Sequence, residues 1–406
     1  MTSHAERPAS YREVFAVGEF RALFTAALLS TLGDQLARVA LAVLVFDRTS
    51  SPALTTLTYL PELIAGPLLS GLADRRPRRA LMVHTDIARA VLVALMAIPG
   101  TPFVILCAFL VLVQLLNAPF SAARAATLPA ALTGDRYVVG SGVSNVANQL
   151  AQLVGFAFGG AMVALIGASP ALLLNAASFL LSAALIRAGV RERPIPVITV
   201  RRPPWGSSVR AGALLVWRDR RLRALVALAC VSGFYITAEG LAVPYAAAIG
   251  GGPTEAGLLL ATAPTGAAIG MVLLSRFVSP AARLRWMGPM AALACVPLLP
   301  CVWYPGWEWT ILLWALSGAA SAYHLTANAE FVRAVPNRGR GQAFGLAVTA
   351  LRMSQGVGIL LAGLAAESEG PGPAISLAGL LGVLAAVGAG AAWQRANQTD
   401  IPAPPG

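Results

Sequence analysis

Apolar runs, separated by short polar segments, follow one another along almost the whole chain. A helix needs about 20 apolar residues to cross the hydrocarbon core of a bilayer, and most of these runs reach that length. Their spacing predicts about twelve membrane-spanning helices and therefore an all-α membrane protein. The expected spans are 22–46, 53–73, 80–98, 102–121, 139–166, 171–187, 222–249, 255–277, 286–304, 309–330, 342–365 and 374–393.

The longest polar interruption follows the sixth predicted span and divides the runs into two equal sets. We expect residues 1–190 to form an N-terminal six-helix bundle and residues 222–395 a C-terminal one, as two pseudo-symmetric halves. Residues 191–221 are the expected basic cytoplasmic linker, in which apolar positions at helical spacing predict an amphipathic helix on the membrane surface. Residues 396–406 are the expected cytoplasmic tail.

Arginine supplies all 30 basic residues of the chain, and its placement predicts the orientation in the membrane. Arg48 falls in a predicted outer loop, and Arg38, Arg89 and Arg352 fall within spans. Every other arginine lies in or beside a segment on one side, and arginine-rich short loops stay in the cytoplasm. We therefore expect a multi-pass protein of the plasma membrane with both termini cytoplasmic. The formal net charge of +12 comes from basic residues in loops beside the membrane. We expect these residues to contact anionic lipids rather than nucleic acid.

The composition excludes several classes of protein. Hydrophobic residues make up 57% of the 406 residues and charged residues 12%, which excludes a soluble globular domain. The first apolar run is too long for a cleaved signal peptide. Without lysine the chain cannot carry a Walker-type phosphate loop, and its histidines and cysteines have no metal-ligand or nucleophile spacing. We expect no enzyme, no cofactor and no metal, with a proton gradient as the energy source.

Charged residues inside predicted spans need a reason, because each costs about 2.5–3.5 kcal/mol at the bilayer centre unless it is paired or faces water. At a rise of about 1.5 Å per residue, Asp34 and Glu62 lie near the middle of their spans. Asp86 and Arg89 lie closer to the cytoplasmic end, three residues apart on one helical face, as a structural pair or a partner of the cytoplasmic turn. Glu239 and Arg352 are the isolated charges of the second half.

Two of these carboxylates are candidates for proton coupling. Asp34 and Arg38 are four residues apart and can pair on one helical face. Glu62 has no arginine at helical spacing, so it can hold a proton more freely. We rank Glu62 first as the proton carrier and Asp34 as the alternative carrier, with Asp34 and Arg38 otherwise acting as a gate or a reader of substrate charge. Glu239 and Arg352 complete the proposed coupling and gating set.

The turn after the second span resembles the signature of the major facilitator superfamily between spans 2 and 3. Ser70 and Pro77 stand where the family carries glycine, and the matching residues are Leu72, Ala73, Asp74, Arg75, Arg78 and Arg79. Gly33, Asp34 and Arg38 in span 1 are similar to the exporter branch of that family, which includes macrolide and siderophore efflux proteins. The same similarity holds for Pro119 to Arg124 and Pro129 after span 4, and for Arg338 to Arg340 before span 11.

In span 5 the chain departs from a pattern that is common among the family's proton antiporters. Gly155, Gly159 and Gly160 are present, but the proline of that pattern is missing. Small residues at this spacing also allow close helix packing, so a structural role stays open.

The resemblance implies roles for further residues. The turn would act as a cytoplasmic latch between the halves, with Asp74 facing the start of span 11; such a contact contributes about 0.3–1 kcal/mol. The expected latch residues are Gly71, Asp74, Arg75, Arg78 and Arg79, with Asp86 and Arg89 as partners. In the family, spans 1, 4, 7 and 10 line a central cavity. That placement implies substrate contacts for Gln114, Asn117, Tyr235, His324 and Asn328, although each can equally bond a neighbouring helix.

We therefore expect a monomeric secondary active transporter that exports amphipathic small molecules in exchange for protons by alternating access. Drugs, secondary metabolites and siderophores are the expected substrates. Two alternatives stay open: uptake or facilitated diffusion of a polar nutrient, and a membrane receptor or enzyme without transport. Because alternating access works in both directions, the sequence sets neither the direction nor the substrate.

Overall fold

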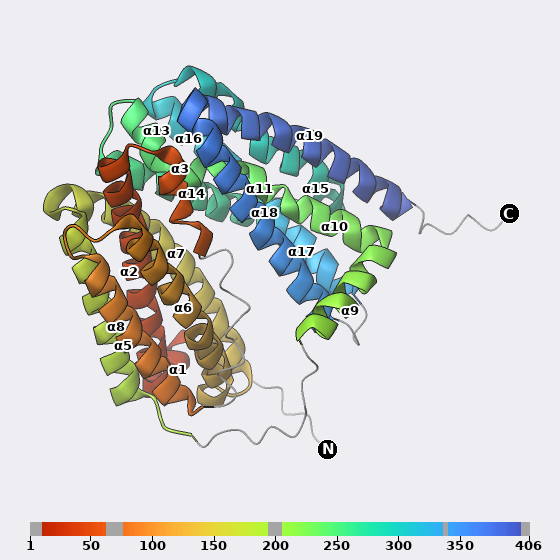
Figure 1. Ribbon diagram of the computed structural model, residues 1–406. Coiled ribbons are helices and arrows are strands. Elements are labelled where there is room, and N and C mark those ends of the chain that lie inside the picture. The colour runs from red at the N-terminus through yellow and green to blue at the C-terminus, as the bar shows by residue number, and fades with distance from the viewer. Residues whose placement is uncertain (1–9, 62–75, 194–204, 336–339, 399–406) are drawn as a thin grey trace, which may run out of the picture. The chain divides into compact units, whose positions relative to one another are not determined.

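The computed structural model describes residues 10–61, 76–193, 205–335 and 340–398, and every regular element in these ranges is a helix (Figure 1). Four residues of the predicted site lie outside the described residues: Glu62, Gly71, Asp74 and Arg75. The contacts divide the chain into two compact units. The first unit is Met1–Leu44 with Ala65–Thr199, and the second unit is Val45–Ile64 with Val200–Gly406.

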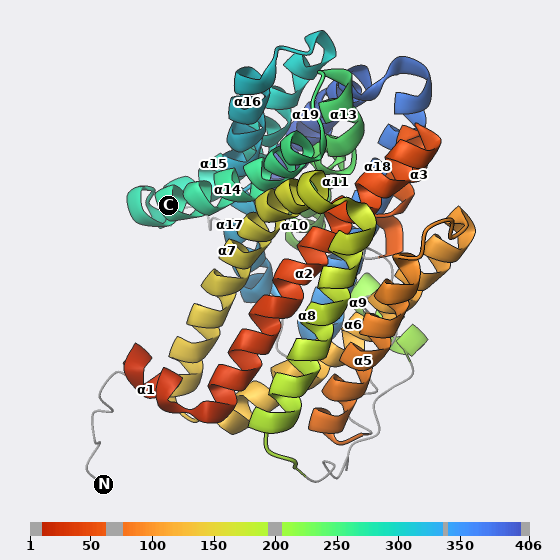
Figure 2. The same cartoon turned by 90° about the vertical axis from the view of Figure 1, so that its left-hand side faces the viewer.

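The first unit is a helical bundle. Figures 1 and 2 both show its long helices running side by side. Its core joins Leu23 of α2, Met82 of α5, Phe120 of α6 and Ile186 of α8, all of which are buried. The helices are α1 (Tyr11–Ala16), α2 (Gly18–Thr49, as far as Leu44), α5 (Arg78–Met96), α6 (Phe103–Ala131), α7 (Asp135–Ile166) and α8 (Ala168–Gly189).

The second unit has more and shorter helices. Its core joins Leu228, Met287, Tyr323 and Trp393, which come from four different helices. The helices are α3 (Pro52–Leu57), α9 (Trp205–Arg218), α10 (Arg220–Cys230), α11 (Ser232–Tyr235), α12 (Thr237–Gly240), α13 (Ala242–Ala248), α14 (Pro253–Phe277), α15 (Pro280–Cys295), the 3-10 helix η2 (Val296–Trp303), α16 (Trp307–Ala320), α17 (Tyr323–Ala334), α18 (Arg340–Glu369) and α19 (Pro371–Gln398).

Nine segments of the described chain are long and apolar enough to cross a membrane. The predicted span 53–73 lies mostly outside the described residues. The third predicted span is α5, whose four charged side chains lower its hydropathy. The tenth is divided at Ser321 into α16 and α17. The nine segments are α2, α6, α7, α8, Arg220–Gly240, α14, Pro280–Trp303, Gln342–Glu369 and Pro371–Asn397.

The predicted span 222–249 is interrupted, because α10, α11, α12 and α13 follow one another with short breaks. Gly233 in α11 lies directly against Gly358 of α18, so a Cβ on either glycine would overlap the other helix's backbone. Glycine also has a low helix propensity. The close approach of this span to α18 therefore requires glycine at both positions.

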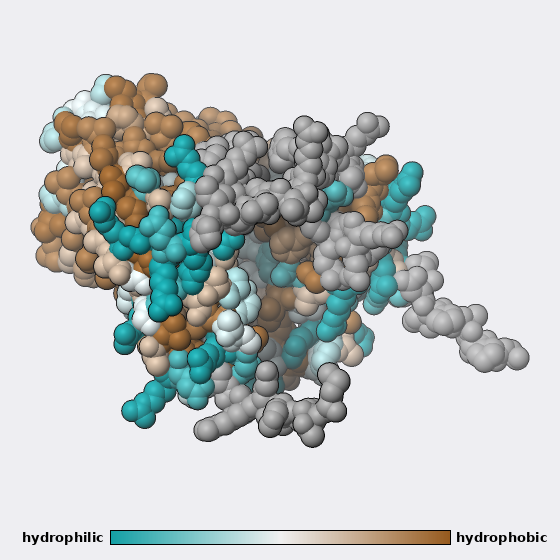
Figure 3. Space-filling view, turned by 90° about the horizontal axis from the view of Figure 1, so that it is seen from below, coloured by the Kyte–Doolittle hydropathy of each residue, from teal (hydrophilic) through white to brown (hydrophobic). Residues whose placement is uncertain are grey.

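Large apolar side chains are exposed on many helices, among them Val104, Leu165 and Phe277. Figure 3 shows hydrophobic residues over the flank at its upper left and hydrophilic residues gathered nearer the middle of that face. Exposed apolar area on this scale is expected of a surface that faces lipid chains. On α9, Trp217 is exposed and Val216 is buried, and the surface position of this linker helix on the membrane stays a prediction.

Candidate functional site

A cluster of charged side chains is buried inside the first unit. Arg89 of α5 has 1% of its surface exposed. Its Nη2 donates to both carboxylate oxygens of Asp34 on α2 at 3.0 Å. Its Nη1 lies 3.3 Å from Oδ1 of Asp86, one turn earlier on α5. One guanidinium thus binds two carboxylates from two helices.

Other side chains complete the surroundings of this charge cluster. Ser182 of α8 donates to Oδ2 of Asp86 at 2.6 Å, and Arg89 also reaches Ser30 on α2 at 3.5 Å. The guanidinium lies over the ring of Phe179 on α8, 3.9 Å from its centroid. Face-on contact with an aromatic ring stabilises a cation where water is excluded. Helices α2, α5 and α8 therefore all contribute to holding Arg89.

The local sequence explains how these helices come so close. Gly33 precedes Asp34, and a Cβ there would overlap the side chains of Asn175 and Ser178 on α8. Glycine at this position lets α2 pack directly on α8. On α5, Asp86 and Arg89 share the buried face of the helix with Ala90 and Val93. The packing of these faces brings Asp34 within reach of Arg89.

The two carboxylates of the cluster share one guanidinium and differ in their access to solvent. A carboxylate is costly in a low-dielectric interior unless it is paired or protonated. Asp86 is fully buried, whereas 32% of the Asp34 side chain is exposed. Asp34 is therefore the carboxylate of this cluster that solvent can reach.

Helical spacing did not predict every partner of Asp34. Asp34 forms an ion pair with Arg89, which is distant in sequence and lies on a neighbouring helix. This contact supplies two hydrogen bonds to the Asp34 carboxylate. The guanidinium of Arg38 lies over the ring of Phe156 on α7, 5.5 Å from its centroid. Ser182 was absent from the sequence-based site, because a lone serine in an apolar span carries no signal.

A second polar group lies in the second unit. His324 of α17 and Tyr235 of α11 share a hydrogen bond of 2.7 Å between Nε2 and the phenol oxygen. The ring of His324 stacks on Tyr323, with centroids 4.5 Å apart, and Tyr323 donates to the carbonyl of Leu228 at 2.8 Å. Tyr235 and Glu239 also line a cavity of about 160 Å³. Two of the predicted substrate contacts are thus in contact with each other.

The other predicted substrate contacts lie apart from this group. Gln114 and Asn117 are half-buried on α6, where Asn117 accepts a hydrogen bond from Ser121 at 3.4 Å. Asn328 on α17 and Arg352 on α18 are exposed. None of these four lines the 160 Å³ cavity of the second unit.

Two of the predicted latch arginines make contacts inside the first unit. Nη1 of Arg78 donates to the carbonyl of Ala126 on α6 at 2.7 Å. Arg79 lies 3.6 Å from Glu192; the Arg79 side chain is half-buried and that of Glu192 is exposed. The latch itself stays a prediction, because Asp74 lies outside the described residues.

The described residues contain no group of three or more His, Cys, Asp or Glu side chains that could hold a metal ion. Cys107, Cys230, Cys295 and Cys301 are free thiols, and the last two are buried. The cysteines thus contribute to helix packing in the described chain.

A comparison with protein families decides the class of this chain. A family model described as Major Facilitator Superfamily matches residues 23–246 and 240–406. The chain belongs to the Major Facilitator Superfamily. The match confirms the predicted all-α membrane fold and the resemblance to the superfamily. Membership of the exporter branch stays a prediction.

One curated relative is an uncharacterized MFS-type transporter, YkuC, of Bacillus subtilis (strain 168). It is 26% identical over 239 residues, which are 55% of this chain and 54% of the relative. The chain thus aligns with about half the length of the curated relative that it matches.

Solved structures with the same fold are also transporters by name. A bacterial homolog of the human lysosomal transporter Spinster has a TM-score of 0.69 at 16% identity, with 96% of each chain covered. The nucleoside transporter NupG has a TM-score of 0.73 at 13% identity, with 93% of this chain and 99% of that chain covered. A bacterial homologue of the iron transporter ferroportin has a TM-score of 0.72 at 13% identity, covering 96% and 99%. The family and these neighbours agree with the prediction that the chain is not an enzyme.

Proposed function

We propose that this chain is a proton-coupled secondary active transporter of the plasma membrane that exports amphipathic small molecules by alternating access. Both termini lie in the cytoplasm, the arginine-rich loops contact anionic lipids, and the protein works as a monomer. Membership of the Major Facilitator Superfamily supports the transporter class. The arginine pattern supports the orientation.

The observation that carries the coupling proposal is the charge cluster of Asp34, Asp86 and Arg89. Two carboxylates share one buried guanidinium there, and the side chain of one of them, Asp34, is partly exposed and within reach of a proton. A proton that binds Asp34 removes its charge and weakens its two hydrogen bonds from Arg89. Arg89 then keeps its ion pair with Asp86. Proton binding thereby loosens α2 from α5, which supplies the conformational change that transport needs.

This geometry changes the order of the candidates for the proton carrier. Asp34 is now favoured, because it is the partly exposed carboxylate of a buried ion-pair cluster. Glu62 stays the second candidate, and Arg38, Glu239 and Arg352 stay predicted gating residues. A proton carrier in this position would make transport depend on the proton gradient.

The experiment uses the full chain in proteoliposomes. A growth-inhibition panel on cells with and without expression of the protein first selects a transported compound. A gradient of that compound across the proteoliposome membrane then drives proton movement, which a pH-sensitive dye trapped inside reports. Asp34→Asn keeps the shape of the side chain and removes its proton site, so we expect substrate-driven proton flux to fall by about tenfold or more. The matched control is Asp47→Asn, an exposed aspartate on the same helix, which should leave the flux unchanged.

Two outcomes would contradict the assignment. If Asp34→Asn keeps full coupling while Glu62→Gln abolishes it, Glu62 is the carrier. If the compound moves with no proton flux in the unmodified protein, transport is uncoupled. Accumulation of the compound in expressing cells, in place of its loss, would indicate uptake.

A further inference from the structure

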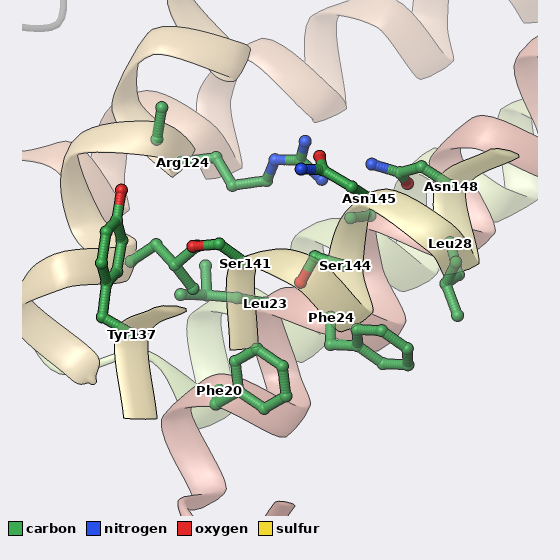
Figure 4. A pocket seen from close by; sticks show the side chains of 13 residues that line it. Phe20, Leu23, Phe24, Leu28, Arg124, Tyr137, Ser141, Ser144, Asn145 and Asn148 are labelled. Atoms are coloured by element: carbon green, nitrogen blue, oxygen red, sulfur yellow. The ribbon is translucent and has the colours of Figure 1, made fainter. Parts of the chain in front are cut away.

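A cavity of about 260 Å³ lies inside the first unit, away from the charge cluster (Figure 4). Its walls come from the start of α2, the end of α6 and the start of α7. This end of the unit is the one that the arginine pattern places in the cytoplasm. The sequence-based substrate site includes none of the residues that line it.

Arg124 is the one cationic residue that lines this cavity, and no carboxylate lines it. The side chain is half-buried. Among the residues that the structure describes, none forms an ion pair with Arg124, whereas Arg79, Arg89 and Arg193 each have a carboxylate partner. Taking a guanidinium out of water without a counter-charge is costly, and a bound anion would offset that cost.

Neutral hydrogen-bond donors accompany Arg124. In Figure 4 its guanidinium extends toward the amide groups of Asn145 and Asn148 on α7. The amide oxygen of Asn148 accepts from Thr31 at 3.4 Å, which leaves the NH₂ group to donate to a ligand. The buried hydroxyl of Ser141 has no hydrogen-bond partner within the described chain. Buried polar groups are rarely left unsatisfied, so this hydroxyl also indicates a missing ligand.

The opposite side of the cavity is aromatic. Figure 4 shows the rings of Phe20 and Phe24 across from Arg124. Phe15 of α1 packs edge-on against both rings, at centroid distances of 5.4 Å and 5.2 Å. Such edge-to-face contacts fix the orientation of the rings. The cavity thus has a rigid apolar side and a cationic, donor-rich side.

We propose that this cavity binds an organic carboxylate, with the anionic group on Arg124, Asn145 and Ser141 and an aromatic ring against Phe20 and Phe24. The volume is slightly below the range of about 300–1,000 Å³ of pockets for drug-sized ligands, so the bound part has one or two rings. The inference rests on the proposed transport function and names its substrate class. The substrates are amphipathic anions that bind from the cytoplasmic side and are exported.

The test measures binding without transport, so its result is independent of the proton-flux assay. Purified full-length protein in nonionic detergent is titrated with 2-naphthoate and with 2-naphthamide, a neutral analogue of the same shape, by calorimetry. We expect the unmodified protein to bind the naphthoate at least tenfold more tightly than the amide. Arg124→Gln should remove that difference, and Arg124→Lys should restore part of it.

Two further variants make the test specific. Asn145→Asp places a carboxylate beside Arg124 and should weaken naphthoate binding tenfold without removing the arginine. Arg136→Gln removes an exposed arginine of α7 that does not line the cavity, and it should bind as the unmodified protein does. Melting temperatures without ligand establish that each variant is folded.

Three results would overturn the proposal. They are equal affinity for the two probes in the unmodified protein, naphthoate affinity that is unchanged in Arg124→Gln, and loss of naphthoate binding when phosphatidylglycerol is added. The last result would assign the cavity to a lipid headgroup. Loss of proton flux in Asp34→Asn together with any of these three would keep the transport function and reject only the substrate class.

Discussion

Arg89 connects helices that are distant in the sequence, because its guanidinium binds Asp34 on α2 and Asp86 on its own helix. Removing the cation breaks the ion pairs of two carboxylates in the interior of the first unit. We expect Arg89→Gln to lower the free energy of unfolding by about 3–5 kcal/mol. Thermal and denaturant unfolding of the purified protein in detergent measures this loss.

A matched control comes from the pair of Arg79 and Glu192, which lies near the surface with Glu192 exposed. Solvent screens that pair, so Arg79→Gln should lower the free energy of unfolding by about 1 kcal/mol or less. Similar losses in Arg79→Gln and Arg89→Gln would contradict the view that the buried cluster stabilises the first unit.

At the scale of single residues, the sequence predicted short-range contacts better than long-range ones. Asp86 and Arg89 are three residues apart on one helix, so their proximity follows from helix geometry alone. The contact between Asp34 and Arg89 requires α2 to lie beside α5, which no spacing encodes. Arg124 was assigned to a cytoplasmic loop because it follows the fourth predicted span, although α6 extends to Ala131 and places it on a cavity wall.

At the scale of helices, α14 and α16 meet through small residues. A Cβ on Gly318 of α16 would overlap the backbone carbonyl of Ala263, and a Cβ on Gly266 or Gly270 of α14 would overlap α16. Close backbone contact of this kind replaces the hydrophobic effect between helices inside a bilayer. We name Gly266, Gly270 and Gly318 the glycine seam.

The seam predicts a contrast between two otherwise similar substitutions. Gly318→Ala forces the two helices apart, and we expect it to lower the free energy of unfolding by about 1–3 kcal/mol. Gly388→Ala, in open space on α19, should raise it by about 0.5–1 kcal/mol through its lower backbone entropy in the unfolded chain. Melting temperatures of the two variants in one detergent make the comparison. A Gly318→Ala protein as stable as the unmodified one would contradict it.

The existence of most helices was predictable from hydropathy, but their interruptions were not. The predicted span 222–249 is divided into four short helices, and the close contact of Gly233 with Gly358 on another helix is tertiary. The glycines of span 5 illustrate the same point. A Cβ on Gly155 would lie 2.8 Å from Cβ of Gln35, and one on Gly159 would lie 3.0 Å from Cα of Leu36. Packing of α7 on α2 therefore accounts for these glycines without an antiporter motif.

At the scale of the whole molecule, the arginine pattern predicts which ends of the helices face the cytoplasm. The prediction can be tested by introducing single cysteines, after the four native cysteines are replaced, and labelling intact cells with a membrane-impermeant maleimide. We expect Asp47→Cys at the end of α2 to be labelled. Arg136→Cys at the start of α7 should react only after the cells are permeabilised.

Both introduced positions are exposed on the protein surface, so access to the reagent decides the outcome. The reversed labelling pattern would invert the proposed orientation. It would also place the cavity beside Arg124 on the outer side of the membrane. The cavity could then not bind anions from the cytoplasm for export.

The basic linker predicts a division of the chain, because arginines and prolines interrupt the apolar pattern there. The contacts add one feature that hydropathy does not reveal, since residues 45–64 group with the second unit. Ser51 of α3 bonds Glu367 of α18, and Thr56 lies against Gly363. Such a grouping depends on polar contacts across a long stretch of sequence.

The glycine seam also limits how this chain can evolve. Where two side chains clash, a second mutation that shrinks the neighbour relieves the clash. At Gly266, Gly270 and Gly318 the obstructing atoms belong to the neighbouring main chain, which every amino acid shares. No compensating substitution at the facing position can therefore restore the fit, and genetic suppressors of a bulky residue at the seam must arise elsewhere in the second unit.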